Sequence, residues 1–458
     1  MPKLAIIGLD CLAPQLVFEQ YREEMPNLKR LMERGMWGRL ESTIPPITVP
    51  AWTAMMSSKN PGTLGFYGFR NRADYTYDRM TIANSSAVKD DRAWDILSRA
   101  GKKVIVLGVP QTYPPSEVNG QMVTCFLTPS KQNQYTWPPE LRDEIDAVAP
   151  DYMIDVEEFR TEDKLALLES IYAMTRHRFV LAKHLTATKP WDFFMMVEMG
   201  PDRLHHAFWK FCDPQHPKYE KGNKFENVIR KYYQYLDRQI GDLLATLGQD
   251  TVVMIVSDHG AQKMDGGICI NEWLLREGYL TLLERPAGVV PLHKAKVDWS
   301  RTVAWGEGGY YTRLFMNVKG REPQGAVPVA DYERVRNELV VRLEAMVDPH
   351  GKNIGTIAFK PEEIYRQTNG IPPDLIVYLG NLAWRSVGGI GHESVHTFEN
   401  DTGPDDANHA QHGVFIMVDP HKPARGQVEG LHITDIGATA VSLFGLPVPD
   451  DMEGKVIV

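Results

Sequence analysis

Cysteine is scarce in this sequence, and long apolar runs are missing from it. The four cysteines among 458 residues stand far apart, which excludes a zinc-finger spacing and a dense disulfide framework. Free thiols in a reducing compartment are the simpler interpretation. No apolar run approaches the roughly 20 residues of a transmembrane helix, and the N-terminal residues show no signal-peptide pattern. We therefore expect a cytoplasmic protein without a membrane partner.

An excess of positive charge is also missing. The formal net charge is -9, which argues against non-specific binding to nucleic acid, so no nucleic acid polymer is expected as a partner. Hydrophobic residues make up 43% and charged residues 24% of the chain, as in an ordinary soluble protein with a large core. The sequence contains no internal repeat and no low-complexity segment.

Residues 251–260 combine a buried strand with polar residues at its end. They read Thr-Val-Val-Met-Ile-Val-Ser-Asp-His-Gly, an apolar β-branched run followed by Asp258 and His259. Ligands of open α/β sheets bind beyond the carboxyl ends of the strands, where these two side chains would emerge. A lone Asp-His pair is also common in polar loops. The functional interpretation therefore depends on whether other strands end in the same way.

Two further strands do end next to acidic residues. Asp10 follows the apolar residues 4–8, and Asp202 follows the apolar residues 191–199. If Pro201 opens a helix, Asp202 and His206 lie four residues apart on one face and can reach one ion. His205 is offset by three residues and is the less favoured ligand. A helical aspartate near the dipole beside a surface histidine pair remains an alternative.

Thr48 stands where a proline-rich turn enters a helix. Pro50 suits the first helical turn, and the Thr48 hydroxyl would face free backbone N–H groups and the positive end of the helix dipole. That position favours a nucleophile that attacks phosphate. A plain capping threonine fits the same local pattern, so both roles stay open.

Residues 388–408 form a Gly-, His-, Asp- and Asn-rich segment with little periodicity, which is typical of a long functional loop. It leads into His409 and His412, just before another strand. Histidines and aspartates without cysteines make a mixed nitrogen and oxygen ligand set, which suits Zn²⁺ or Mn²⁺. Two such ions about 4 Å apart can clamp the attacking and leaving oxygens of a phosphoryl group.

The order of elements predicts an α/β fold with a mostly parallel central sheet, because buried strands alternate with helical patterns. Residues 110–150 carry many turn signals and are expected to be irregular. We expect one catalytic domain over residues 1–458, with an insertion or cap at residues 110–160. A second insertion or subdomain is expected at residues 284–400.

Taken together, these motifs resemble the alkaline phosphatase superfamily, and within it the type I phosphodiesterase/nucleotide pyrophosphatase branch. The resemblance extends from residue 4 to residue 446, and its motifs are residues 7–10 (Ile-Gly-Leu-Asp), 48–52 (Thr-Val-Pro-Ala-Trp), 202–206 (Asp-Arg-Leu-His-His), 257–260 (Ser-Asp-His-Gly) and 408–416 (Asn-His-Ala-Gln-His-Gly-Val-Phe-Ile). It implies a three-layer sandwich with helices on both faces of the sheet and insertions over its carboxyl edge.

The resemblance also implies two metal sites. One would be formed by Asp10, Thr48, Asp258 and His259, and the other by Asp202, His206 and His409. His412 is the alternative to His409, which is preferred for its offset from Gly413. Thr48 would be the catalytic nucleophile, and the cofactors would be two divalent ions, zinc or else manganese.

We therefore expect a metal-dependent hydrolase of small phosphate esters. The preferred interpretation is a phosphodiesterase or nucleotide pyrophosphatase that acts through a phospho-threonine intermediate. A phosphomonoesterase, a phosphonate hydrolase or a phosphotransferase would use the same ligands. The sequence departs from the branch at Phe69, near the place where nucleotide pyrophosphatases often carry a phosphate-binding asparagine. A binding protein with a decayed site is the least favoured alternative, because no expected ligand is missing.

Overall fold

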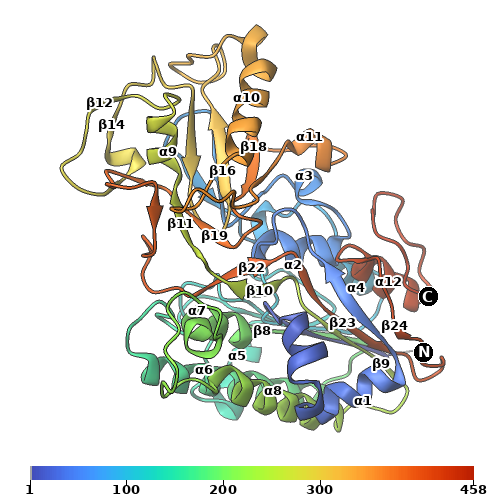
Figure 1. Cartoon of the computed structure of the whole chain (residues 1–458). Helices are drawn as coiled ribbons and strands as arrows, with labels where there is room; N and C mark the ends of the chain where they lie inside the picture. The colour runs from blue at the N-terminus through green and yellow to red at the C-terminus, as the bar shows by residue number, and fades with distance from the viewer. Residues whose placement is uncertain (1–2) are drawn as a thin grey trace.

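The computed structural model describes residues 3–458 and is built on one ten-stranded sheet (Figure 1). In spatial order its strands are β24 (Gly426–Gln427), β2 (Met36–Glu41), β23 (His412–Val418), β9 (Thr251–Val256), β1 (Lys3–Leu9), β8 (Phe193–Glu198), β5 (Val104–Leu107), β6 (Gly120–Val123) and β7 (Thr136–Trp137), with β25 (Leu431–His432) beside β2. Strands β9, β1, β8, β5 and β6 are parallel to one another, whereas β23 and β7 pair in the antiparallel sense. The predicted mostly parallel sheet is confirmed.

Helices cover both faces of the sheet, because its central strands are apolar on both sides (Figure 1). One face carries α1 (Pro26–Arg34), α6 (Lys164–Thr188), α7 (Gly200–Cys212) and α8 (Val228–Leu244), with α5 (Leu141–Val148) packed on α6. The other face carries α2 (Thr48–Ser57), α4 (Ala93–Arg99) and α12 (Asp435–Leu443), which pack on one another. The three-layer α/β sandwich expected from the sequence is thereby confirmed.

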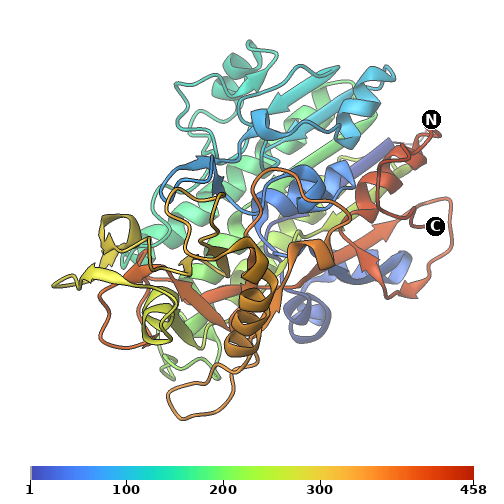
Figure 2. The ribbon, with the colours of Figure 1, turned by 90° about the horizontal axis from the view of Figure 1, so that it is seen from above.

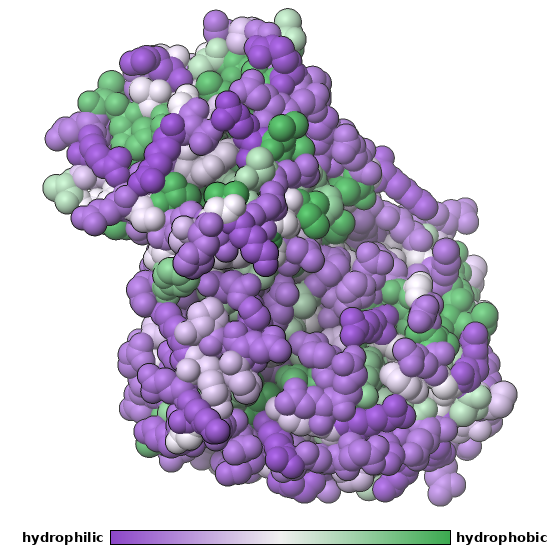
Figure 3. All heavy atoms as spheres, viewed as in Figure 1, coloured by the Kyte–Doolittle hydropathy of each residue, from purple (hydrophilic) through white to green (hydrophobic). Residues whose placement is uncertain are grey.

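A second lobe rises beyond the carboxyl edge of the sheet (Figures 1 and 2). Its four-stranded sheet consists of β15 (Ala304–Glu307), β16 (Thr312–Met316), β18 (Leu375–Tyr378) and β17 (Ile357–Phe359), flanked by α9 (Ile270–Arg276) and α10 (Tyr332–Glu344). The lobe has an apolar core of its own, around Trp305 and Leu314. In Figure 3 a waist separates it from the main body, and hydrophilic residues cover most of that face. That residues 284–400 form a second insertion stays a prediction.

Short elements complete the chain. They are the ladder strands β3 (Arg70–Arg72), β4 (Met80–Ile82), β11 (Gly266–Cys269), β12 (Leu282–Glu284), β13 (Val290–Pro291), β14 (Lys296–Val297), β19 (Trp384–Val387), β20 (Gly389–Ile390) and β21 (His396–Thr397), and the α-helices α3 (Pro61–Leu64) and α11 (Pro361–Ile364). The remaining short elements are a π-helix, η1 (Gln15–Gln20), and the 3-10 helices η2 (Arg22–Glu24), η3 (Ser85–Ala87), η4 (Leu292–Lys294) and η5 (Val329–Asp331). No helix among residues 3–458 has both the length and the apolar character needed to cross a membrane.

An antiparallel ladder joins the two lobes. Strand β10 (Gly260–Lys263) pairs with β22 (Ala407–Ala410), so that Ala261 lies opposite His409. Strand β10 leaves the main body directly after β9, and β22 returns to it just before β23. The whole second lobe therefore lies between the two strands of this ladder.

The expectation of an irregular segment at residues 110–150 is wrong for part of it. Strands β6 and β7 extend the main sheet, and helix α5 follows them. Neither strand exceeds four residues, and two prolines follow β7 directly, so no period could be read from the sequence. That residues 110–160 form an insertion or cap stays a prediction.

Candidate active site

Three predicted ligands meet where β1 and β9 end. Asp10, Asp258 and His259 are fully buried, and one ligand atom of each lies within 4.8 Å of the others. The Trp52 indole N–H donates to Asp10 Oδ2 at 2.6 Å, and the Cys11 amide donates to Asp258 Oδ1 at 3.2 Å. Each carboxylate thus has one oxygen fixed by the protein and the other free to bind an ion.

Thr48 is the first residue of helix α2, and its hydroxyl faces this group. Its Oγ1 atom lies 3.3 Å from Nε2 of His259. Ile47 occupies the cap position, and no side chain caps the helix. The Thr48 hydroxyl therefore does not cap the helix. The alternative of a plain capping threonine, which the sequence left open, does not apply.

Asp202, His206 and His409 form the second group. Asp202 lies in the first turn of helix α7, and His206 follows one turn later. The His206 and His409 Nε2 atoms stand 3.3 Å and 3.8 Å from Asp202 Oδ1, and 3.3 Å from each other. The His259 and His409 rings stack with centroids 3.7 Å apart, which places the two groups side by side.

The residues of both groups fit divalent cations. Asp10 Oδ1, Asp258 Oδ2 and Asp202 Oδ1 are buried oxygens without a hydrogen-bond donor in the described chain. Burial raises the pKa of Asp10, and the neighbouring Asp202 raises it further. Burial and the charge of Asp10 likewise raise the pKa of Asp258. A cation between such carboxylates would relieve both the desolvation and the mutual repulsion.

Hydrogen bonds from the outer nitrogens orient all three histidines. His409 Nδ1 lies 2.7 Å from the Pro46 carbonyl oxygen, and His259 Nδ1 lies 3.1 Å from the Gly260 carbonyl oxygen. A carbonyl can only accept, so these Nδ1 atoms carry the proton and each Nε2 lone pair is left for a metal. His206 Nδ1 faces Asp405 Oδ1 at 2.8 Å in the same manner.

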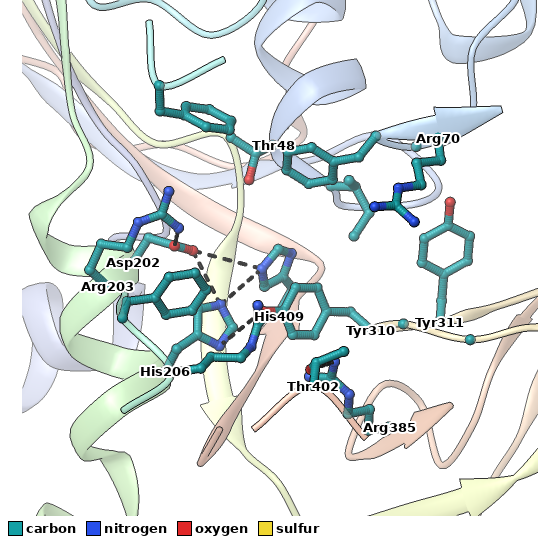
Figure 4. A pocket seen from close by; sticks show the side chains of 18 of the residues that line it. Thr48, Arg70, Asp202, Arg203, His206, Tyr310, Tyr311, Arg385, Thr402 and His409 are labelled. Atoms are coloured by element: carbon teal, nitrogen blue, oxygen red, sulfur yellow. Dashed lines mark hydrogen bonds and ion pairs between the residues drawn. The ribbon is translucent and has the colours of Figure 1, made fainter. Parts of the chain in front are cut away.

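A cavity of about 490 Å³ opens onto Thr48 and the second group (Figure 4). Arg203 reaches into it and pairs with Asp202 at 2.7 Å and with Asp155. The Tyr310 ring stacks on His409 at a centroid distance of 4.2 Å and on His206 at 4.8 Å. The cavity is thus bounded by cations and aromatic rings beside the ligand groups.

All seven predicted site residues come together: Asp10, Thr48, Asp202, His206, Asp258, His259 and His409. His412 is exposed at the start of β23, outside both groups. His205 is buried, but its Nε2 contacts the Tyr233 hydroxyl at 2.9 Å instead. Sequence reasoning missed Asp405 and Tyr310, and the acidic loop before His409 was the only available signal for Asp405.

Comparison with known proteins identifies a family and similar structures. The family model "type I phosphodiesterase / nucleotide pyrophosphatase" matches residues 4–413. Human ectonucleotide pyrophosphatase/phosphodiesterase 5 has a similar structure, with a TM-score of 0.58 at 12% identity over 98% of this chain and 96% of that one. The murine protein, as an inactive variant in complex with AMP, gives a TM-score of 0.57 at 12% identity with the same coverage.

Among curated protein sequences, none matches this one. The family model nevertheless covers most of the chain and includes every residue of both ligand groups. The structural neighbours establish the fold, at identities too low to carry a substrate. This chain therefore belongs to the type I phosphodiesterase/nucleotide pyrophosphatase family of the alkaline phosphatase superfamily, and it is a phosphoric ester hydrolase.

Proposed function

We propose that this enzyme hydrolyses a phosphodiester or pyrophosphate bond with two divalent ions, through a phospho-threonine at Thr48. The observation that carries the proposal is the placement of Thr48 Oγ1. It lies beside His259 of the first group and lines the same cavity as Asp202, His206 and His409 of the second. A nucleophile in this position is open to a substrate that occupies the cavity and touches the second group.

The two ligand groups define where the ions would bind. Asp10, Asp258 and His259 would hold one ion beside Thr48, and Asp202, His206 and His409 would hold the other. When bound, the ions supply positive charge that favours the Thr48 alkoxide and neutralises charge on the phosphoryl oxygens. Mixed imidazole and carboxylate donors favour zinc, with manganese as the alternative.

The chain's own residues orient the reaction. Thr48 gives its proton to water, its Oγ1 forms a bond to phosphorus, and the leaving oxygen departs with the electron pair of its bond to phosphorus and takes up a proton from water. The first turn of α2, which no side chain caps, would offer its free N–H groups to the phosphoryl oxygens, and such a helix start favours anions. Water then cleaves the phosphorus–Oγ1 bond and regenerates Thr48.

The size of the cavity favours an ester with two organic or phosphoryl substituents. A volume of about 490 Å³ lies in the range of small-molecule sites and exceeds the needs of a lone phosphate. The AMP complex of the murine neighbour makes a small nucleotide ester a reasonable candidate. A phosphomonoesterase or phosphotransferase would use the same residues, and the nature of the acceptor, water or another hydroxyl, separates these activities.

A cytoplasmic location is part of the same proposal. All four cysteines are free thiols, and three of them are buried. Free thiols suit a reducing compartment.

A panel of 4-nitrophenyl phosphate mono- and diesters, assayed with added Zn²⁺ or Mn²⁺, tests the proposed function. We expect metal-dependent release of nitrophenol, fastest from diesters, and two bound ions per chain by elemental analysis. The variant Asp258→Asn serves as the matched inactive control. Only trace metal in the purified protein, together with no gain in activity on adding either ion, would contradict the proposal.

A further inference from the structure

Five arginines line the cavity, and they fall into two classes. Arg203 pairs with Asp155 and Asp202, while Arg160 and Arg385 both pair with Asp405. Arg70 and Arg313 are different, because neither forms an ion pair with any carboxylate among residues 3–458. Within residues 3–458, therefore, no carboxylate lies within ion-pairing distance of either guanidinium.

The two unpaired arginines are held next to each other by the fold. Arg70 opens strand β3, whose hairpin contacts the second lobe through the Arg72–Glu322 ion pair, and Arg313 lies in β16 of that lobe. The Arg313 Nη1 atom donates to the backbone carbonyl of Arg70, which ties the two segments together. In Figure 4 Arg70 lies across the cavity from Asp202 and Arg203, away from the metal-ligand end.

Nearby acidic residues do not neutralise this arginine pair. Glu307 is the cross-strand partner of Arg313 in the β15–β16 ladder, yet the two side chains form no ion pair. Glu157 also lines the cavity, and it is exposed and unpaired in the described chain. Both side chains line the same cavity, so an anion bound there would be attracted by two positive charges.

We propose that Arg70 and Arg313 bind a second phosphate of the substrate, one that is not cleaved. The substrate class is then an ester whose non-reacting end carries a terminal phosphate. Two guanidinium charges match a phosphomonoester, which carries about −1.5 to −2 at neutral pH, better than they match a carboxylate. Guanidinium groups also bind phosphate oxygens in a bidentate manner. This inference rests on the proposed function, since the scissile phosphoryl group must lie at Thr48.

A series of chromogenic diesters tests the inference. Each has a 4-nitrophenyl leaving group and an alkyl chain of about two to six carbons that ends in hydroxyl, carboxylate or phosphate. We expect kcat/KM for the best phosphate-ended diester to exceed that of its hydroxyl-ended counterpart by about 10- to 100-fold, as charged hydrogen bonds provide. In Arg70→Gln/Arg313→Gln this ratio should fall to near one.

The matched control is Arg301→Gln, which removes an exposed arginine of the same lobe outside the cavity and should leave the ratio unchanged. A wild-type ratio near one, or a ratio that survives the double substitution, would overturn the inference. An equal preference for the carboxylate-ended diester would overturn the assignment to phosphate. Hydrolysis of the hydroxyl-ended diester reports on the proposed function independently.

Binding can be measured without turnover. Calorimetric titration of metal-loaded Thr48→Ala with 1,4-butanediol bisphosphate and with 4-hydroxybutyl phosphate gives two dissociation constants. We expect the bisphosphate to bind about tenfold or more tightly, and the advantage to vanish in the Thr48→Ala/Arg70→Gln/Arg313→Gln protein. Equal affinities for the two compounds would refute the second phosphate site even if no diester is hydrolysed.

Discussion

Asp405 Oδ1 lies 2.8 Å from Nδ1 of His206, and the ring therefore turns its other nitrogen toward Asp202. Asp405 is fully buried at its side chain and touches no other ligand of the second group. We predict that Asp405→Asn lowers metal affinity about 10- to 100-fold, as removal of an outer partner of a ligating histidine does elsewhere. Competition with a chelator of known affinity measures this loss.

The neighbouring Asp406 provides the matched control for Asp405→Asn. Its carboxylate pairs with Lys210 at 3.4 Å and does not contact the His206 ring. The variant Asp406→Asn makes the same change in charge one residue further on, and it should keep wild-type metal affinity. Equal losses in the two variants would show that Asp405 acts only through the charge of the loop.

Thr48→Ala should abolish turnover while the fold and the metal content persist. Because no side chain caps helix α2, loss of this hydroxyl removes no cap, and we expect a Tm shift below about 4 °C. Turnover should fall by several orders of magnitude if Thr48 is the nucleophile. Thr48→Ser keeps a hydroxyl and should retain part of the activity. A metal-loaded Thr48→Ala protein with activity within about tenfold of wild type would exclude the covalent route.

The variants His409→Ala and His412→Ala show which of the two histidines near the start of strand β23 is the metal ligand. His409 is buried with its Nε2 facing Asp202 and His206, whereas His412 is exposed. We predict that His409→Ala loses one of two ions and most activity, and that His412→Ala keeps both. Elemental analysis and the diester assay report the two properties. The reverse pattern would assign the ligand to His412.

The buried carboxyl of Glu198 gives the stability a pH dependence that can be isolated. Burial raises its pKa from 4.5 to about 7, against the lowering effect of Arg178 and of hydrogen bonds from Thr175 and Gly200. The folded chain therefore holds this proton more tightly than the unfolded chain does. As pH rises from about 4.5 to about 7, the folded state loses stability relative to the unfolded state, and above that range the loss is complete.

Glu198→Gln should remove this loss, because the amide does not ionise. Between about pH 5 and about pH 8, the Tm of the variant should rise relative to that of the wild type. The difference in the free energy of unfolding should reach roughly 3 kcal/mol at most. Scanning fluorimetry of the two metal-free proteins across this range measures the gap. Parallel Tm curves would mean that Glu198 ionises normally.

The metal-ligand end of the site was predictable because it follows from sheet geometry. Asp10 and Asp258 stand directly after strands whose apolar runs are unmistakable, and carboxyl ends of neighbouring parallel strands meet at one edge. Asp202 and His206 required only the helical spacing of four residues. Buried strands and helix periods are local signals, so one sequence suffices to read them.

The rest of the site was not predictable, because it is assembled by irregular segments. Asp405 sits in a loop without periodicity, and Tyr310 and Arg313 reach the cavity only through the packing of the second lobe. Whether an arginine forms an ion pair with a carboxylate likewise depends on the tertiary structure. Strands β6 and β7 escaped notice for a different reason, since runs of four residues or fewer carry no readable period.

The β10–β22 ladder separates the residues of the reaction centre from the lobe that lines part of the cavity. Its four residue pairs hold His409 against the end of β9, whatever the length of chain between residues 263 and 407. That intervening lobe contributes Tyr310, Arg313 and Arg385 to the cavity and contributes none of the seven ligand-group and nucleophile residues. The ladder is thus a natural junction for grafting, at which one lobe can be exchanged for another to alter substrate choice, provided that the replacement keeps Asp405, which orients the His206 ring.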